Sequence, residues 1–135
     1  MISAADLSSA FPEVDPCEWP VGPRVLVQLQ TVREKTSGGI VLVEETREVN
    51  QAISQVGKVV ALGQIAFCNR ETGYRWPEGV WCKTGDIVRI PKYVGHRFSR
   101  NLPDSKDKAN FVLLEDHQIS SVVDPSKFDM ITELV

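Results

Sequence analysis

The sequence predicts an all-β protein built as a small β-barrel or sandwich, and three features carry that prediction. Short apolar stretches recur along the chain, several with the period of two that a half-buried strand shows. Glycine, proline, asparagine and aspartate separate these stretches where the chain must turn. Helical spacing of apolar residues is nearly absent between the two ends of the chain. Closely spaced short strands with turns between them are typical of barrels and sandwiches.

Each expected strand rests on its own pattern. Val25, Val27 and Leu29 alternate with their neighbours, as a half-buried strand requires. Pro91 cannot donate a hydrogen bond to a ladder, so it marks a sheet edge or the end of its strand. In chain order the expected strands are residues 23–32, 56–63, 86–95, 111–114 and 118–123, the last two joined by a turn at 115–117. Between them we expect a hairpin or long loop over 64–86 and a polar loop over 100–110.

The patterned region, residues 20–124, is predicted to form one β domain with an extension at each end. In the N-terminal extension, residues 1–19, a weak capping box precedes a short helix over 4–10, and three prolines then stop regular structure. The C-terminal extension, residues 125–135, follows an aspartate and opens with proline, which is the pattern of an N-cap and a first helical position. Its apolar spacing predicts a short amphipathic helix.

Composition excludes several classes of protein. The chain has 135 residues, of which 42% are hydrophobic and 24% charged, as expected for one globular domain. Its net charge is −3, and no basic tract interleaved with aromatic residues is apparent, so we expect no nucleic-acid partner. No run reaches the roughly 18 apolar residues of a membrane span, and no signal peptide is recognisable. Three cysteines are too few for a disulfide framework, which favours a reducing cytoplasm.

No catalytic or metal site is predicted. His96 and His117 lack a metal-like spacing with cysteine. Cys68 and Cys82 read as ordinary small apolar residues, although a hairpin over this segment would let the two thiols face each other. The acidic pair at 115–116 falls in an expected tight turn, which favours a solvated turn over an acid/base pair. We therefore expect that the chain is not an enzyme and needs no cofactor.

The stretch KTSGGIVLVEETREVNQ, residues 35–51, has two readings. Gly38 and Gly39 precede the apolar run Ile40–Val43, and a polar tract follows that could not hold a core. In one reading the glycines turn the chain and the run pairs back with residues 25–32 as a hairpin. In the other the stretch is an exposed loop that presents the run to another protein, because loops of this length are usually functional or mobile.

Four blocks of sequence, in the same order, resemble the GroES-type co-chaperonins. They are PRVLVQLQTVREKTSGGIVL (23–42), VGKVVALG (56–63), KTGDIVRIPKYVG (83–95) and FVLLEDHQISSVVD (111–124). The first block is similar to that family's first strand and mobile loop, with its Gly-Gly-Ile-Val-Leu motif at the same spacing. The others are similar to the strand after the loop, the Gly-Asp strand with its Lys-Tyr turn, and the closing strands with their acidic turn.

The resemblance implies a GroES-like β-barrel subunit with a long mobile loop and a roof hairpin, assembled into a ring that is usually a heptamer. The first and last strands would pair between neighbouring subunits. Such a ring caps a GroEL-type chaperonin through its apical domains and assists the folding of enclosed client proteins. The chaperonin, and not the cap, would bind ATP or ADP and magnesium. The expected location is the cytoplasm.

The same resemblance assigns the binding residues. The two glycines would act as a hinge, and the apolar tripeptide would insert into a groove on the chaperonin. The roof hairpin would lie between Leu62 and Gly85. Carried over residue by residue, the chaperonin-binding set is Gly38, Gly39, Ile40, Val41 and Leu42.

The chain departs from the family pattern in its two extensions, in a longer tract before residue 56, in an aromatic-rich roof and in a long loop over 99–110. A divergent, extended co-chaperonin of this kind would suit a bacteriophage. The extensions also motivate an alternative, in which a virion or other structural protein uses the fold without binding a chaperonin. An enzyme that uses a similar barrel, such as a medium-chain alcohol dehydrogenase, is disfavoured because the sequence has no GxGxxG strand–helix unit.

Overall fold

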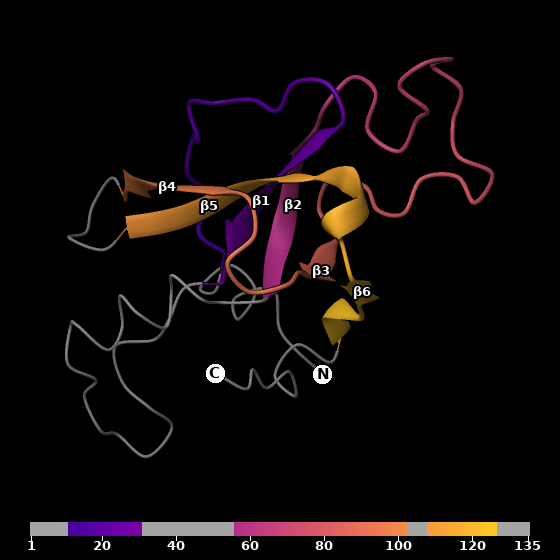
Figure 1. Cartoon of the computed structure of the whole chain (residues 1–135). Coiled ribbons are helices and arrows are strands. Elements are labelled where there is room, and N and C mark those ends of the chain that lie inside the picture. Colours follow the sequence, from indigo (N-terminus) through magenta and orange to yellow (C-terminus); the bar gives the residue numbers. More distant parts are fainter. Residues whose placement is uncertain (1–10, 31–55, 103–107, 127–135) are drawn as a thin grey trace.

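The computed structural model describes residues 11–30, 56–102 and 108–126, and in this part of the chain the protein is nearly all β (Figure 1). The strands are β1 (Arg24–Leu29), β2 (Val56–Leu62), β3 (Ile87–Arg89), β4 (His96–Asn101), β5 (Lys108–Glu115) and β6 (Ser121–Val123). A 3-10 turn, η1 (Asp116–Gln118), lies between β5 and β6. The six strands form one antiparallel sheet in the order β4-β5-β1-β2-β3-β6. The all-β prediction is confirmed.

β1 lies at the centre of the sheet, between β2 and β5. Its alternation sends Val25, Val27 and Leu29 to one face, where all three are buried. Leu26 and Gln28 point to the opposite face and are also buried, Gln28 with only 4% of its surface exposed. Both faces of the central strand are therefore covered.

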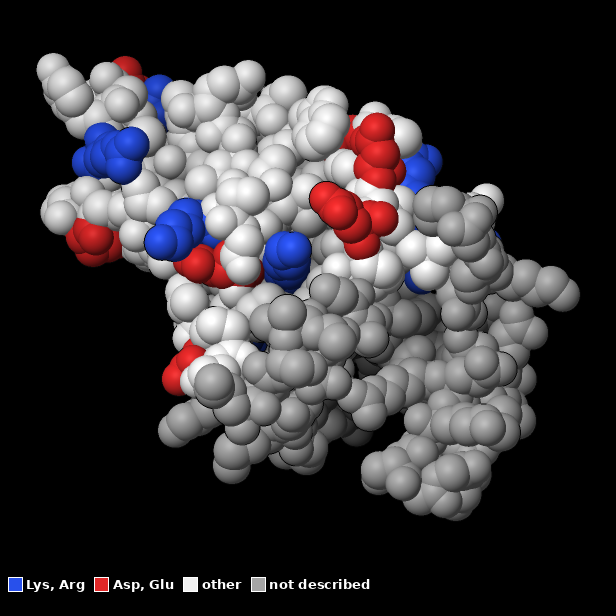
Figure 2. All heavy atoms as spheres, turned by 180° about the vertical axis from the view of Figure 1, so that it is seen from behind, with Lys and Arg blue, Asp and Glu red and all other residues white. Residues whose placement is uncertain are grey.

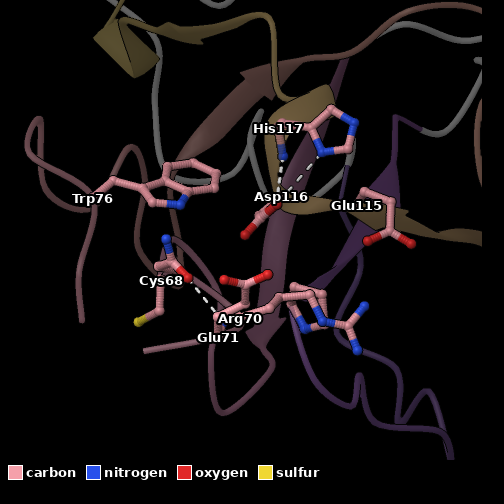
Figure 3. A pocket seen from close by; sticks show the side chains of 9 residues that line it. Cys68, Arg70, Glu71, Trp76, Glu115, Asp116 and His117 are labelled. Carbon is pink, nitrogen blue, oxygen red and sulfur yellow. Dashed lines mark hydrogen bonds and ion pairs between the residues drawn. The ribbon is translucent and has the colours of Figure 1, made fainter. Parts of the chain in front are cut away.

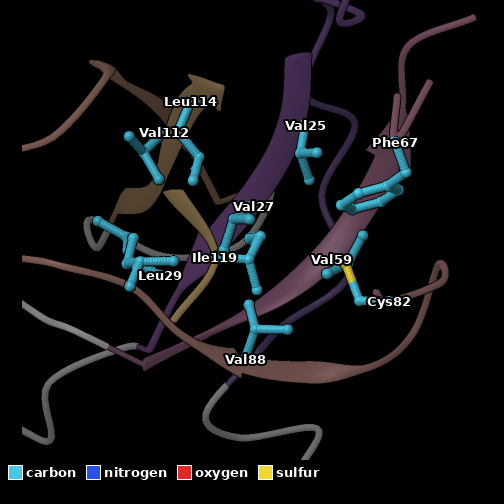
Figure 4. Close-up of a cluster of buried hydrophobic side chains, with 11 residues drawn as sticks. Val25, Val27, Leu29, Val59, Phe67, Cys82, Val88, Val112, Leu114 and Ile119 are labelled. Carbon is cyan, nitrogen blue, oxygen red and sulfur yellow. The ribbon is translucent and has the colours of Figure 1, made fainter. Parts of the chain in front are cut away.

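The main core covers the face that Val25, Val27 and Leu29 share (Figure 4). Side chains from neighbouring strands complete it, and four further residues come from outside the strands. The cluster consists of Val25, Val27, Leu29, Val59, Phe67, Cys82, Val88, Ile90, Val112, Leu114 and Ile119. Because a buried aliphatic or aromatic side chain contributes about 1.5–3 kcal/mol, this cluster is the main source of the fold's stability.

A smaller cluster covers the opposite face of the sheet. Leu26, Ala109 and Phe111 are fully buried there, and the rings of Phe98 and Phe111 stack with centroids 5.3 Å apart. Val14, which precedes the sheet in sequence, packs against this cluster. Part of the expected N-terminal extension thus lies on the sheet.

The segment 64–86 combines several turns with one minimal hairpin. Cys68 and Arg75 form an isolated bridge, and no strand is assigned within the segment. Phe67 anchors the segment to the core: its ring centroid lies 5.6 Å from that of Trp76 and 5.9 Å from that of Trp81. Both readings of this segment are met in part. Residues 67–76 form a minimal hairpin, in which the Trp76 N–H donates to the Phe67 carbonyl and the Asn69 N–H to the Tyr74 carbonyl, and the rest is a long, packed loop.

The predicted strand over 86–95 is too long. β3 ends at Arg89, shortly before Pro91, as the missing N–H of proline requires. The chain then turns through Tyr93 and Gly95, whose φ angles are +60° and +71°. A β-carbon at position 95 would collide with the carbonyl oxygen of Leu113, so glycine is needed at this turn.

β4, which follows that turn, is absent from the sequence prediction. Its residues HRFSRN are mostly polar, and in sequence they continue into the expected polar loop 100–110. They are extended because they pair along their whole length with β5, from His96 opposite Leu113 to Asn101 opposite Lys108. This long-range pairing also starts β5 at Lys108, three positions before the predicted strand.

The turn between the last two strands was expected over 115–117 and is found as η1. Its N-terminal end is closed by a capping box, in which the side chain of Gln118 accepts a hydrogen bond from the Glu115 N–H at 2.9 Å. β6 begins three positions after the start of the predicted strand 118–123: η1 takes up Gln118, and Ile119 and Ser120 connect η1 to the strand.

The expected terminal helices fall on residues outside those that the structure describes. The start of the C-terminal extension is visible: the Asp124 carboxylate accepts hydrogen bonds from the N–H and the hydroxyl of Ser126, at 2.9 and 2.7 Å. That geometry is the one an N-cap aspartate provides. The division into an extension over 1–19, a domain over 20–124 and a tail over 125–135 stays a prediction.

Candidate functional site

The predicted chaperonin-binding residues lie in the segment 31–55, outside the described residues. They are Gly38, Gly39, Ile40, Val41 and Leu42. The structure does describe the two points at which this segment leaves and rejoins the sheet, and these define the base of the candidate site.

The two ends of the segment lie side by side. The N–H of Gln30 donates a hydrogen bond to the carbonyl of Val56 at 3.0 Å, next to the paired residues Leu29 and Gly57. Leu29 and Val56 are both fully buried. A firm stem formed by β1 and β2 therefore holds both ends of the segment at one edge of the core.

Gly57 makes this stem compact. A β-carbon at position 57 would collide with the side chain of Val27 and would lie 2.8 Å from the carbonyl oxygen of Gln28. Only glycine allows so close an approach of the strand to its neighbour. The glycine was visible in the sequence as a boundary of the second strand, but its packing role was not.

The two edges of the sheet differ in character. The edge strand β4 has the mostly polar sequence HRFSRN and includes Arg100, and polar and charged side chains on an edge discourage pairing with other chains. The edge strand β6 has the sequence SVV, and Val122 on it is 52% exposed. Within the described part of the chain β6 pairs only with β3, and no described strand lies on its other side.

Two more exposed apolar residues precede β1. Trp19 is 64% exposed and Val21 is 58% exposed, although the prolines beside them, Pro16 and Pro20, are buried. Sequence reasoning placed this segment at the end of an extension and assigned it no role. Its only signal was a large aromatic residue in a tract without a strand pattern.

A pocket lies between the long loop 64–86 and η1, with a volume of about 690 Å³ (Figure 3). Its most buried group, the Asp116 carboxylate, accepts hydrogen bonds from the N–H groups of Phe67 and His117, both at 2.8 Å. Those bonds occupy the carboxylate in holding the loop. The lining residues are Pro23, Cys68, Asn69, Arg70, Glu71, Trp76, Glu115, Asp116 and His117.

The pocket is not arranged as a catalytic or metal site. Within the described ranges no group of three His, Cys, Asp or Glu side chains could hold a metal ion. The three cysteines of the chain are free thiols, and Cys68 and Cys82 are not bonded to each other. Burial, aided by the nearby Asp86 carboxylate, raises the pKa of the Cys82 thiol to about 11, so this thiol stays protonated and unreactive at neutral pH.

The charged residues are dispersed. Figure 2 shows basic and acidic side chains interspersed over the described part of one face, with no continuous patch of one sign. A nucleic-acid surface would require such a patch of positive charge. None of the helices in the described part of the chain is long and apolar enough to cross a membrane.

Comparison with known proteins identifies the family. A model of the chaperonin 10 kDa subunit family matches residues 19–123. The chain belongs to this family. The matched range includes β1 and β2, which form the stem of the segment 31–55, and it begins at the exposed Trp19.

Individual co-chaperonins agree with this assignment. The co-chaperonin GroES of Lacticaseibacillus zeae is 41% identical over 76 residues, which cover 56% of this chain and 73% of that protein. GroES of Limosilactobacillus reuteri is 37% identical over 82 residues, or 61% of this chain and 79% of that protein. The 20 kDa chloroplastic chaperonin of Arabidopsis thaliana is 30% identical over 104 residues, or 77% of this chain and 36% of that protein.

Family membership confirms the predicted resemblance and the co-chaperonin function. It also confirms that the chain is not an enzyme and that it needs no cofactor of its own, because a chaperonin 10 subunit is a non-enzymatic cap. The pocket beside Asp116 is accordingly a structural feature of this co-chaperonin and not an active site.

Proposed function

We propose that this co-chaperonin caps a GroEL-type chaperonin ring and contacts its apical domains through residues 38–42. The observation that carries the proposal is the family match across 19–123, which spans the Gly-Gly-Ile-Val-Leu motif. The stem supports it, because Gln30 and Val56 hold the two ends of the segment together on a firm base.

The proposed contact works by burial of apolar surface. Ile40, Val41 and Leu42 would enter a groove of the chaperonin, while Gly38 and Gly39 allow the backbone to reorient. The polar tract that follows keeps the free segment soluble. The cap supplies no chemistry, and ATP or ADP with magnesium belongs to the chaperonin.

Capture by an immobilised GroEL-type chaperonin tests the proposal. We expect the chain to be retained when ADP or ATP and magnesium are present and to be released when nucleotide is removed. Retention is measured by quantifying bound chain, with the chaperonin lacking nucleotide as control. A chain that is never retained would support the alternative of a structural protein that uses the fold without binding a chaperonin.

We further propose that subunits assemble into a ring, as a heptamer, in the cytoplasm. The resemblance implies that the first and last strands pair between subunits, but the first strand, β1, is already paired on both sides within the subunit. We therefore expect the other side of β6 to pair with the segment just before β1, around Trp19 and Val21, of the next subunit. This head-to-tail contact repeats until the ring closes, which leaves no open β6 edge. The charged edge strand β4 would stay outside the contact. A bacteriophage source stays a prediction.

Replacing Val122 by aspartate should abolish assembly and leave the subunit folded. Val122 is 52% exposed in the subunit, so the substitution should change the stability of the isolated subunit little. In the proposed contact, by contrast, the new carboxylate would be buried against Trp19 and Val21. Native mass spectrometry at micromolar concentration should show monomers. The control is Val80→Asp, because Val80 is 40% exposed in the loop 64–86. Intact rings of the Val122 variant would exclude this edge as the contact.

A further inference from the structure

The N-terminal arm, residues 11–18, lies outside the part of the chain that the family model matches. The arm is nevertheless packed against the sheet, along its β4–β5 side (Figure 1). Phe11 is 4% exposed, Pro16 is buried, and Val14 contacts the cluster around Leu26 and Phe111. The arm therefore covers a sheet face that would otherwise present apolar side chains to water.

Two polar side chains of the sheet bind the backbone of the arm. Gln28, buried on β1, donates a hydrogen bond from Nε2 to the carbonyl of Pro12 at 2.7 Å. Arg100 on β4 donates from Nε to the carbonyl of Pro16 at 2.8 Å. Proline has no N–H but keeps its carbonyl, so these two contacts use the acceptors that a proline-rich arm still offers.

Arg100 joins the end of the arm to the sheet by two contacts and makes a third contact within β4. Besides Pro16, its Nη2 contacts the Glu18 carboxylate at 2.8 Å. Its guanidinium lies over the ring of Phe98, 5.3 Å from the centroid. A planar guanidinium can donate in two directions while stacking on a ring, which lysine cannot do. The residue directly after this anchor is Trp19.

We propose that the arm is a brace for the subunit contact, with Arg100 as its positioning residue. The inference rests on the proposed ring. Anchoring Pro16 and Glu18 fixes the direction in which Trp19 and Val21 leave the sheet. A fixed segment loses less conformational entropy when it meets β6 of the next subunit, so the brace favours assembly without touching the neighbour.

The test is Arg100→Met in the full chain, with Arg70→Met as the matched control because Arg70 is an exposed arginine of the loop 64–86. Methionine keeps much of the aliphatic stem and removes both hydrogen bonds. Hydrogen exchange by mass spectrometry reports release of the arm, and native mass spectrometry over a dilution series gives the concentration at half assembly. We expect exchange in residues 11–18 to accelerate and the half-assembly concentration to rise about tenfold, with neither change in Arg70→Met.

Two results would overturn the brace. One is faster exchange of the arm with unchanged assembly, and the other is an arm that stays protected without Arg100. If Arg100→Met does not fold, Glu18→Ala decides: Glu18 is exposed, and a roughly threefold weakening of assembly is expected, whereas no weakening counts against the brace. A wild-type chain that is monomeric throughout overturns the proposed ring itself, whereas a wild-type ring with unaffected variants overturns only the brace.

Discussion

Replacing Ile40 by aspartate should abolish capture by the chaperonin while leaving assembly and melting temperature nearly unchanged. The substitution places a carboxylate in a contact that is proposed to be apolar, and an unpaired charge in such an environment costs several kcal/mol. Every subunit of a ring would carry the same substitution, so each of its contacts with the chaperonin would be weakened. The measurement is capture in the presence of ADP and magnesium, with melting and native mass spectrometry on the same samples.

The energetics of the loop explain why one residue can have this effect. Burying Ile40, Val41 and Leu42 gains roughly 1.5–3 kcal/mol each. Ordering about a dozen residues of a free loop costs about 1–2 kcal/mol per residue, which offsets most of that gain. A single loop therefore binds weakly, and the ring binds through repetition, since avidity can exceed single-site affinity by on the order of 10²–10⁴. A marginal contact does not survive the loss of one apolar anchor.

The matched control is Val49→Asp, which adds the same carboxylate to the same segment outside the tripeptide. It should be captured like the wild-type chain. If Ile40→Asp instead unfolds the subunit, the hairpin reading of residues 35–51 is correct and the proposal fails. Full capture of a folded Ile40→Asp ring would place the contact elsewhere on the chain.

The central strands could be predicted because their own side chains specify them. β1 and β2 fall inside the predicted stretches 23–32 and 56–63, where apolar residues are buried on the sheet. β4 could not, because HRFSRN has one large apolar residue and becomes a strand only through its pairing with β5. A local pattern predicts a strand when the segment's own side chains become buried. It does not predict an edge strand whose extended conformation depends on pairing with a neighbour.

The arm shows the same limit at longer range. Its prolines correctly indicated the absence of regular structure, but prolines do not indicate where an irregular segment packs. Pro16 meets Arg100 across a separation of 84 residues in sequence. The motif at 38–42 could be found from the sequence because its glycines and apolar residues are contiguous. A contiguous block can be compared directly with the motif of a known family.

The tie between the loop 64–86 and the end of the sheet gives the largest expected effect on stability. Asp116 is 3% exposed, and its carboxylate binds the N–H of Phe67, which lies 49 residues away in sequence. Phe67 is fully buried and holds a φ of +62°, a conformation that the surroundings must impose on a residue with a side chain. Asp116 also binds the N–H of His117, so one carboxylate fixes both the loop and η1.

Replacing Asp116 by alanine should lower the free energy of unfolding by about 1.5–3 kcal/mol, because hydrogen bonds to a charged group are lost and the buried N–H of Phe67 keeps no partner. Asp116→Asn should lose less, since its amide oxygen can still accept from Phe67. Urea unfolding at constant protein concentration measures both. Trp76 and Trp81 pack on Phe67 while Trp19 is exposed, so a shift in native fluorescence would report loosening of the loop. Wild-type stability in the alanine variant would mean that the packing of Phe67 alone holds the loop.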